Sequence, residues 1–236
     1  MLCRHRSEAG KDETDITVRI EGIADGLRNR LAIHYAVEGD LRFISHQDTL
    51  RLFRRTLTRA GVPLRYSEGF NPRPRVRIAL PRPVGVATLS DLLVVELISD
   101  EDPVTLLTRV ATEVPEGMRL LHAERLDERD RRLPCSARYS MDLDPRTCES
   151  VAQSAAEFLA KESVLVRRTI GQGPAYRDIN IRVFITSMQV SDGELSWVQS
   201  ISPDGTAKIG EVLDSIGLSG RTLMHRVVRR QTTYET

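Results

Sequence analysis

Three arginines at alternate positions, Arg73, Arg75 and Arg77, are the residues of this chain best suited to binding an anion. Successive side chains of a strand face opposite ways, so the three guanidinium groups would share one face while Val76 and Ile78 share the other. Neighbouring arginines would lie about 6.5 to 7 Å apart, close to the spacing of phosphates along an extended nucleic-acid strand. The pattern predicts a row of positive charge that fits a polyanion.

The surrounding turn residues limit how long this strand can be. Prolines lack the N–H that a sheet ladder needs, so we expect the strand to be confined to residues 75–80, between Pro74 and Pro81. Gly69 and Asn71 supply the turn that leads into it.

The charges of the chain are segregated. Residues 30–85 contain eleven arginines and four acidic residues, whereas residues 86–162 contain nine basic and sixteen acidic residues. One interpretation is that the arginines only keep an outer face soluble and pair with carboxylates elsewhere. The segregation favours a binding function instead.

Other polar side chains near the arginines could do acid–base chemistry if they converged, namely His46, Asp48, Tyr66 and Glu68. Ser45 and Asp48 form a capping-box pattern at the start of a predicted helix, where His46 could contact an anion. The alternative is a helical first turn that simply needs polar residues. His34, His46 and His122 occur singly, and the sequence has no G-x-G-x-x-G, Walker, H-E-x-x-H or G-x-S-x-G motif. We therefore predict no catalytic residue, no metal site and no cofactor.

The elements that would position these residues follow a βαββαβ order. We expect strands at residues 31–37, 75–80, 91–98 and 118–125, a turn at 38–40 leading to an extended segment at 41–44, and helices at 45–61 and 102–114. This order is the ferredoxin-like plan, in which both helices cover one face of an antiparallel sheet. The other face is left open for a partner.

The same order of elements is expected a second time after the charged segment 126–134. We expect strands at residues 137–143, 164–168, 179–190, 194–200 and 223–228, and helices at 147–161 and 209–216. The predicted fold is therefore α+β with two tandem ferredoxin-like domains, residues 30–126 and 135–236. Residues 1–29 are expected to form a mobile leader with one short strand at 16–23.

Composition bounds the class of protein. The chain has 236 residues, of which 40% are hydrophobic and 28% charged, as is typical of globular proteins. Cys3, Cys135 and Cys148 are not clustered, so neither a disulfide framework nor a thiolate metal site is predicted. No segment has the apolar length of a signal peptide or membrane span. We expect a cytoplasmic protein that does not enter a membrane.

Four sequence motifs carry a resemblance to a known family. They are F-I-S-H-x-D at residues 43–48, R-L-F-x-R-x-L at 51–57, Y-S-x-G-F-N-P-R-P at 66–74 and A-L-P-x-P-x-G at 79–85. These motifs resemble the bacterial DUF2344 family, also called radical SAM-linked or radical SAM-associated proteins. Arg77 stands where the resemblance implies a small polar residue.

The resemblance implies association with a radical S-adenosylmethionine (SAM) enzyme. This chain lacks the C-x-x-x-C-x-x-C motif that holds the cluster of such an enzyme, so it would be the partner and not the catalyst. The predicted function is a non-catalytic accessory module that docks on the enzyme and helps to present its substrate. The candidate binding residues are Ser45, His46, Asp48, Tyr66, Glu68, Phe70, Asn71, Arg73, Arg75 and Arg77.

An RNA-binding or RNA-modifying protein is the alternative function. It would use the basic surface of the tandem sheets to bind RNA or another polyanion. Tyr66 and Phe70 are the aromatic residues that the motifs offer for stacking on bases, which favours backbone contacts over sequence-specific recognition.

Overall fold

The computed structural model describes residues 29–127, 129–169 and 175–235. Its strands are β1 (Asn29–Val37), β2 (Val76–Ile78), β3 (Ala87–Leu97), β4 (Met118–Leu126), β5 (Leu133–Asp142), β6 (Leu165–Thr169), β7 (Tyr176–Asn180), β8 (Ile185–Ser191), β9 (Glu194–Ser200) and β10 (Val228–Glu235). Its α-helices are α1 (His46–Arg59), α2 (Pro103–Ala111), α3 (Cys148–Ala160), α4 (Ile209–Ser215) and α5 (Gly220–Leu223). Short 3₁₀ helices cover Gly39–Phe43, Pro145–Thr147, Arg182–Phe184 and Met224–Arg226.

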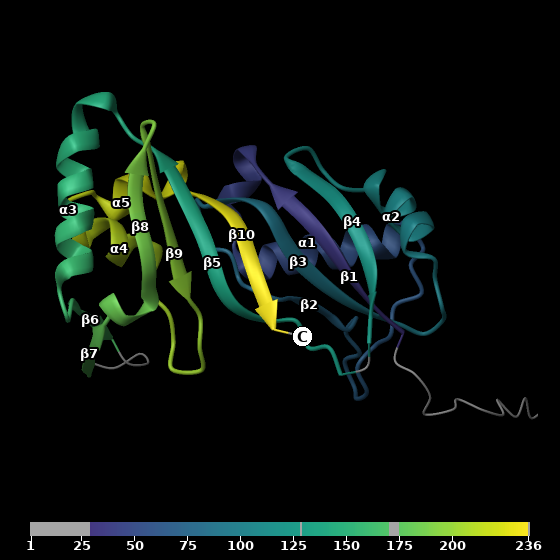
Figure 1. The fold of residues 1–236 in the computed structure, drawn as a ribbon. Coiled ribbons are helices and arrows are strands. Elements are labelled where there is room, and N and C mark those ends of the chain that lie inside the picture. The colour runs from purple at the N-terminus through teal and green to yellow at the C-terminus, as the bar shows by residue number, and fades with distance from the viewer. Residues whose placement is uncertain (1–28, 128, 170–174, 236) are drawn as a thin grey trace, which may run out of the picture.

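One large, mostly antiparallel sheet contains eight of these strands. Seven follow the order β4-β1-β3-β10-β5-β9-β8, and β2 pairs with β3 beside this path. The C-terminal strand β10 lies between β3 and β5, parallel to the first and antiparallel to the second (Figure 1). The fold is therefore α+β, as predicted, and the last strand of the chain joins its two halves.

The first half of the sheet packs against α1 and α2. Helix α1 buries Leu50, Phe53 and Leu57, which recur at the spacing of one helical face. The rings of Phe53 and Tyr35 meet edge to face at 4.7 Å. The helix prediction for this segment is confirmed, because the apolar stripe and the cap at Ser45 agree.

The second half has its own core on the same side of the sheet. Tyr139 of β5 and Trp197 of β9 stack with ring centroids 5.4 Å apart. Phe158 of α3 and Leu213 of α4 are buried in the same cluster. The sheet therefore has one face covered by helices along both halves.

Three segments that were expected to be extended differ from the structure in part or in full. Residues 41–43 belong to the 3₁₀ helix Gly39–Phe43, whose first residue, Gly39, takes a φ of 55°. The expected strand at 179–190 is interrupted because Asn180 Oδ1 accepts bonds from the amides of Val164 and Arg182, which turns the chain. Residues 223–226 are helical, since Ser219 caps α5 and a 3₁₀ turn continues it.

The strand expected at 75–80 is shorter than predicted. It spans Val76–Ile78, and the backbone oxygen of Pro74 accepts a bond from Val76 N instead of joining the ladder. The expected leader and the strand at 16–23 lie outside the described residues.

Candidate functional site

The face of the sheet opposite α1 carries polar side chains of the first half. Figure 1 shows α1, α4 and α5 behind the sheet, so no described helix covers β1, β3 and β4 on the near side. Cross-strand pairing places alternate residues together on this open face: Arg30, Ala32 and His34 of β1, Arg77 of β2, Leu92, Val94 and Glu96 of β3, and His122, Glu124 and Leu126 of β4. The face therefore combines arginines, histidines and an apolar floor.

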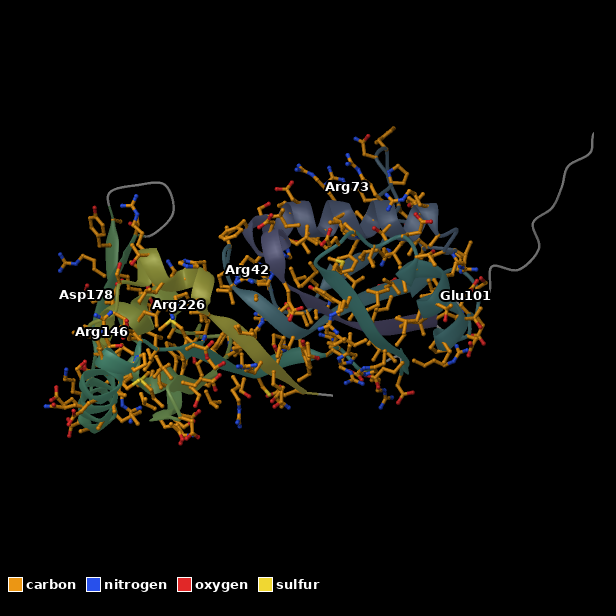
Figure 2. All side chains as sticks on the ribbon, turned by 90° about the horizontal axis from the view of Figure 1, so that it is seen from above. Arg42, Arg73, Glu101, Arg146, Asp178 and Arg226 are labelled. Atoms are coloured by element: carbon orange, nitrogen blue, oxygen red, sulfur yellow. The ribbon has the colours of Figure 1, made fainter. Side chains whose placement is uncertain are left out.

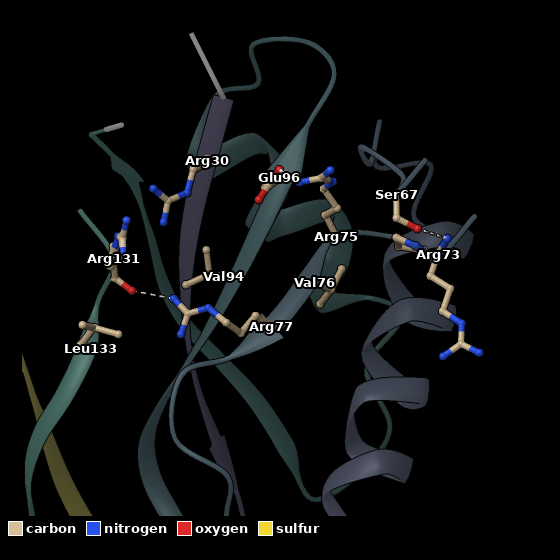
Figure 3. Close-up of a pocket in the computed structure, with 11 residues that line it drawn as sticks. Arg30, Ser67, Arg73, Arg75, Val76, Arg77, Val94, Glu96, Arg131 and Leu133 are labelled. Atoms are coloured by element: carbon tan, nitrogen blue, oxygen red, sulfur yellow. Dashed lines mark hydrogen bonds and ion pairs between the residues drawn. The ribbon is translucent and has the colours of Figure 1, made fainter. Parts of the chain in front are cut away.

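Several of the arginines line one cavity of about 680 Å³, which we call the arginine pocket (Figure 3). Its lining residues are Arg30, Ser67, Arg73, Pro74, Arg75, Val76, Arg77, Val94, Glu96, Arg131 and Leu133. Glu96 is the one carboxylate among these lining residues, against five arginines. The pocket is therefore a concentrated region of positive charge.

Arg77 reaches across the pocket toward the loop after β4. Its Nη2 donates a hydrogen bond to the backbone oxygen of Arg131 at 2.6 Å. Burial lowers the pKa of the Arg77 guanidinium, and the charge of Arg30 lowers it further. Because arginine normally titrates far above neutral pH, Arg77 remains charged. Two like charges are thus held near each other on this face.

Arg75 has a carboxylate partner. Its Nη1 lies 3.6 Å from Glu96 Oε2, which is buried and accepts no hydrogen bond from the described residues. At this distance the two side chains form an ion pair but no hydrogen bond. This contact matches the alternative in which an arginine pairs with the acidic block of residues 86–162.

Arg73 does not continue the row of Arg75 and Arg77. Its backbone closes a loop, because Arg73 N donates to Ser67 Oγ at 3.0 Å and Ser67 N donates to the backbone oxygen of Arg73 at 2.9 Å. Figure 3 shows the Arg73 guanidinium directed away from those of Arg75 and Arg77. The expected single row of three is therefore wrong, because the strand begins only at Val76.

The loop closed by Arg73 presents aromatic side chains to solvent. Tyr66 pairs with Pro74 in an isolated bridge, and Glu68 to Asn71 form the tip. Gly69 takes a φ of 114°, which other residues rarely adopt. The relative exposure of Phe70 is 106%, and that of Tyr66 is 47%. An aromatic ring this exposed is available to a partner.

Ser45, His46 and Asp48 form the first turn of α1. Ser45 Oγ accepts a bond from Asp48 N at 3.1 Å and donates one to Asp48 Oδ2 at 2.7 Å. The pKa of Asp48 is lowered by the bond from Ser45 and by Arg51. Asp48 itself therefore supplies the negative charge that the N-terminus of a helix favours. Burial lowers the pKa of His46, whose Nδ1 is buried without a described partner.

The structure does not bring the two groups of acid–base candidates together. His46 and Asp48 begin α1, whereas Tyr66 and Glu68 follow its other end, where Leu64 pairs with Leu97 at the end of β3. A helix of 14 residues spans about 20 Å. The geometry gives no support to an enzyme that uses these four residues.

The A-L-P-x-P-x-G motif lies where the two halves meet. Arg82 is buried and donates to the backbone oxygens of Leu41, Arg42 and Val86 at 2.6 to 3.0 Å. Gly85 N donates to the backbone oxygen of Arg42 at 2.7 Å. Arg42 also donates to the backbone oxygen of His225, and Figure 2 shows Arg42 near the junction. This part of the motif block, as we call the four motifs at residues 43–85, holds the fold together.

A buried ion pair completes the junction. Arg229 of β10 donates to Asp91 of β3 at 2.9 and 2.5 Å, and both side chains are 1% exposed. Arg229 also donates to the backbone oxygens of Leu80 and Pro81. This pair was not predicted from the sequence, although the carboxylate of Asp91 within an apolar strand was a signal that it needs a cation.

Arg30 and Arg131, which also line the pocket, were not predicted as binding residues. Both lie outside the motifs at residues 43–85, and only the alternation of β1 could have placed Arg30 on the open face.

Among the described cysteines, Cys135 and Cys148 are free. None of the described helices has the length and apolar character needed to cross a membrane.

Comparisons with known proteins give a family but no activity. A family model described as "Uncharacterized protein conserved in bacteria (DUF2344)" matches residues 30–212. No curated protein matches the chain. A solved structure described as "Crystal structure of putative glycine cleavage system transcriptional repressor" is 14% identical, with 89% of this chain and 98% of that chain covered and a TM-score of 0.24. A TM-score this low supports no argument about fold or function.

Proposed function

The chain belongs to the bacterial protein family DUF2344, and from the arginine pocket on its open face we propose that it is a non-catalytic accessory module that holds an anionic substrate for a radical SAM enzyme. The observation that carries the proposal is the placement of Arg77 beside Arg30 in a cavity with one carboxylate among its lining residues. Like charges disfavour each other, and an anion between them would relieve that cost.

The size and chemistry of the pocket fit a small anionic group. Its volume of about 680 Å³ lies in the range of ligand sites in proteins. Guanidinium groups bind phosphate and carboxylate through two parallel hydrogen bonds. The apolar floor under the pocket includes Val94, which would exclude water from the bound group.

The partner enzyme is inferred from the resemblance of the motifs. The A-L-P-x-P-x-G segment is held by hydrogen bonds where the two halves of the sheet meet. The exposed loop of Tyr66 to Pro74 is therefore the part of the motif block that is available for docking. Phe70 at its tip offers an apolar ring to a partner surface. The loop borders the arginine pocket through Ser67 and Pro74, so docking there would bring the enzyme to the bound substrate.

The fold that supports this function is proposed to be two ferredoxin-like units, residues 30–126 and 135–236. The strand order supports it, because β4-β1-β3-β2 in the first half and β10-β5-β9-β8 in the second follow the same pattern. We propose that the protein lies in the cytoplasm, because the radical SAM enzyme would be its partner there.

RNA binding is the second candidate function. The exposed rings of Tyr66 and Phe70 next to the Arg73 backbone favour it, since aromatic rings among arginines stack on bases. An RNA strand would extend from the arginine pocket over this loop.

One capture experiment separates the two candidates. The full chain is immobilised, exposed to native bacterial cytoplasm, and the retained material is analysed for a radical SAM enzyme by mass spectrometry and for RNA by sequencing. We expect the enzyme to be retained by the wild type and reduced at least about tenfold by Phe70→Ala, with Phe43→Ala, another exposed phenylalanine, as the matched control. If the wild type retains RNA but no radical SAM enzyme, and Phe70→Ala no longer retains that RNA, the second function would be established instead.

A further inference from the structure

Two histidines and a glutamate meet on the open face, away from the residues of the arginine pocket. His34 of β1 and His122 of β4 are directly paired across the two strands, and Ala32 is paired with Glu124. Since alternate residues of a strand share a face, Glu124 lies on the same side as His122. The pairing thus places three metal-binding side chains next to one another.

From this arrangement we propose that His34, His122 and Glu124 form a binding site for a divalent transition-metal ion such as Zn²⁺. The proposal goes beyond the proposed function and does not depend on it. Imidazole nitrogen and carboxylate oxygen are preferred Zn²⁺ ligands, and two histidines with one glutamate form a known set that leaves a fourth position for water.

The distances suit a metal after small side-chain movements. The two imidazole rings are stacked, with centroids 3.9 Å apart and planes at 15°. His34 Nε2 lies 3.2 Å from Glu124 Oε1, and one ligand atom from each residue lies within 4.8 Å of the others. Tetrahedral ligands at 2.0 to 2.1 Å from Zn²⁺ are about 3.4 Å apart. Rotation of the exposed His122 can therefore close the site without moving the strands.

The surrounding residues hold one of the two histidines, His34, in place. The side chain of His34 is 14% exposed, whereas His122 is exposed. Nε2 of His34 is held 3.2 Å from Glu124 Oε1, so these two ligand atoms already lie side by side.

Arg132 also contacts the carboxylate of Glu124. Its Nη2 lies 3.1 Å from Glu124 Oε1 and its Nε lies 2.8 Å from Asp130 Oδ2. The backbone of Arg132 takes a positive φ of 44°, a conformation that is costly for a residue other than glycine and is enriched at functional sites. A bound cation would share Glu124 with Arg132.

The fourth position of the metal would face the same side as the arginine pocket. Arg30 and His34 are four residues apart on β1 and share its open face, so they lie about 13 Å apart. An elongated anionic ligand could reach both places.

Zinc titration of the full chain tests the site. The protein carries Cys3→Ser, because a free thiol is a competing type of Zn²⁺ ligand. It is freed of metal with a chelator and titrated with Zn²⁺ against a chromophoric chelator. We expect one equivalent of Zn²⁺ to bind, and His122→Ala or Glu124→Gln to weaken the affinity for Zn²⁺ by at least about tenfold. A loss of this size is already typical when a residue that only supports a metal ligand is changed. His225→Ala, a change at another exposed histidine, should leave the affinity unchanged.

Two further readouts exclude a merely structural effect of the variants. The melting temperature without metal should be the same in His122→Ala and its parent, and Zn²⁺ should raise it only in the parent. Arg132→Gln should bind Zn²⁺ several-fold more tightly, because Glu124 no longer shares its charge. Failure of the parent protein to bind one equivalent, or full affinity in His122→Ala, would overturn the proposal.

Discussion

Arg229 and Asp91 form a fully buried ion pair that joins the C-terminal strand to the centre of the first half of the sheet. Two hydrogen bonds of 2.9 and 2.5 Å connect them, and neither side chain is more than 1% exposed. The Arg229 guanidinium also donates to the backbone oxygens of Leu80 and Pro81 in the motif block. The pair therefore couples β3, β10 and the segment between β2 and β3.

Breaking this pair is expected to be costly. Asp91→Ala leaves the Arg229 charge buried without its partner, so the free energy of unfolding should fall by about 3 to 5 kcal/mol. The double variant Asp91→Leu with Arg229→Met should lose less, because both buried charges are gone. Urea unfolding followed by fluorescence of Trp197 measures both. A double variant less stable than Asp91→Ala would contradict the interpretation.

The start of α1 depends on Ser45. Since Ser45 Oγ accepts the Asp48 amide bond, Ser45→Ala should lower the free energy of unfolding by about 0.5 to 2 kcal/mol, the usual cost of a lost helix cap. Ser99→Ala, at an exposed position outside any helix, is the control. Equal stability of the two variants would show that the cap is not needed.

Alkaline pH should destabilise the fold through Tyr234. Burial and then the charge of Asp91 raise its pKa to about 12 in the folded protein, against about 10 when unfolded. The stabilisation by neutral Tyr234 is therefore complete below pH 10 and is lost as pH rises from 10 to 12, by at most about 2 to 3 kcal/mol.

The measurement compares melting temperatures of the wild type and Tyr234→Phe between pH 9 and 11.5. Tyr35 and Tyr139 remain in both proteins, so the difference isolates Tyr234. The wild type should lose stability more steeply, and Tyr176→Phe, at an exposed ring, should follow the wild type. Parallel curves for the wild type and Tyr234→Phe would refute the assignment.

The sequence predicted those parts of the fold that depend on local patterns. The helix of residues 46–59 follows from the spacing of Leu50, Phe53 and Leu57 and from the cap at Ser45. Residues 223–226 look like a strand by composition, but the cap at Ser219 makes them helical. Local features decided the places where the patterns failed: the positive φ of Gly39 before residues 41–43, and side-chain hydrogen bonds of Asn180 and Ser219 at the other two.

Contacts between distant segments could not be predicted. Arg229 and Asp91 are 138 residues apart, and they meet only because β10 inserts between β3 and β5. His34 and His122 were each interpreted as isolated histidines, since nothing local shows that β1 and β4 are neighbours. The arginine pocket draws Arg30 and Arg131 from outside the motif block for the same reason.

A change of Phe70, at the tip of the exposed loop, distinguishes docking on the enzyme from stacking on an RNA base. If Phe70 stacks on a base, Phe70→Ala should weaken binding of a 12-nucleotide single-stranded RNA by about 1 to 3 kcal/mol. If Phe70 docks on the enzyme, as proposed, RNA affinity should stay unchanged while enzyme retention falls. Fluorescence anisotropy with labelled RNA at several salt concentrations gives the answer. Because Phe70 is fully exposed, the melting temperature should not change in either case.

The most direct test of the anion-binding pocket is calorimetric titration with inorganic pyrophosphate. We expect the wild type to bind one pyrophosphate. Arg77→Gln should weaken this binding at least about tenfold through loss of a charge-assisted contact, whereas Arg55→Gln, on the exposed side of α1, should bind like the wild type. Equal affinity of folded Arg77→Gln and wild-type protein, or no binding by the wild type, would show that the arginine pocket is not an anion-binding site.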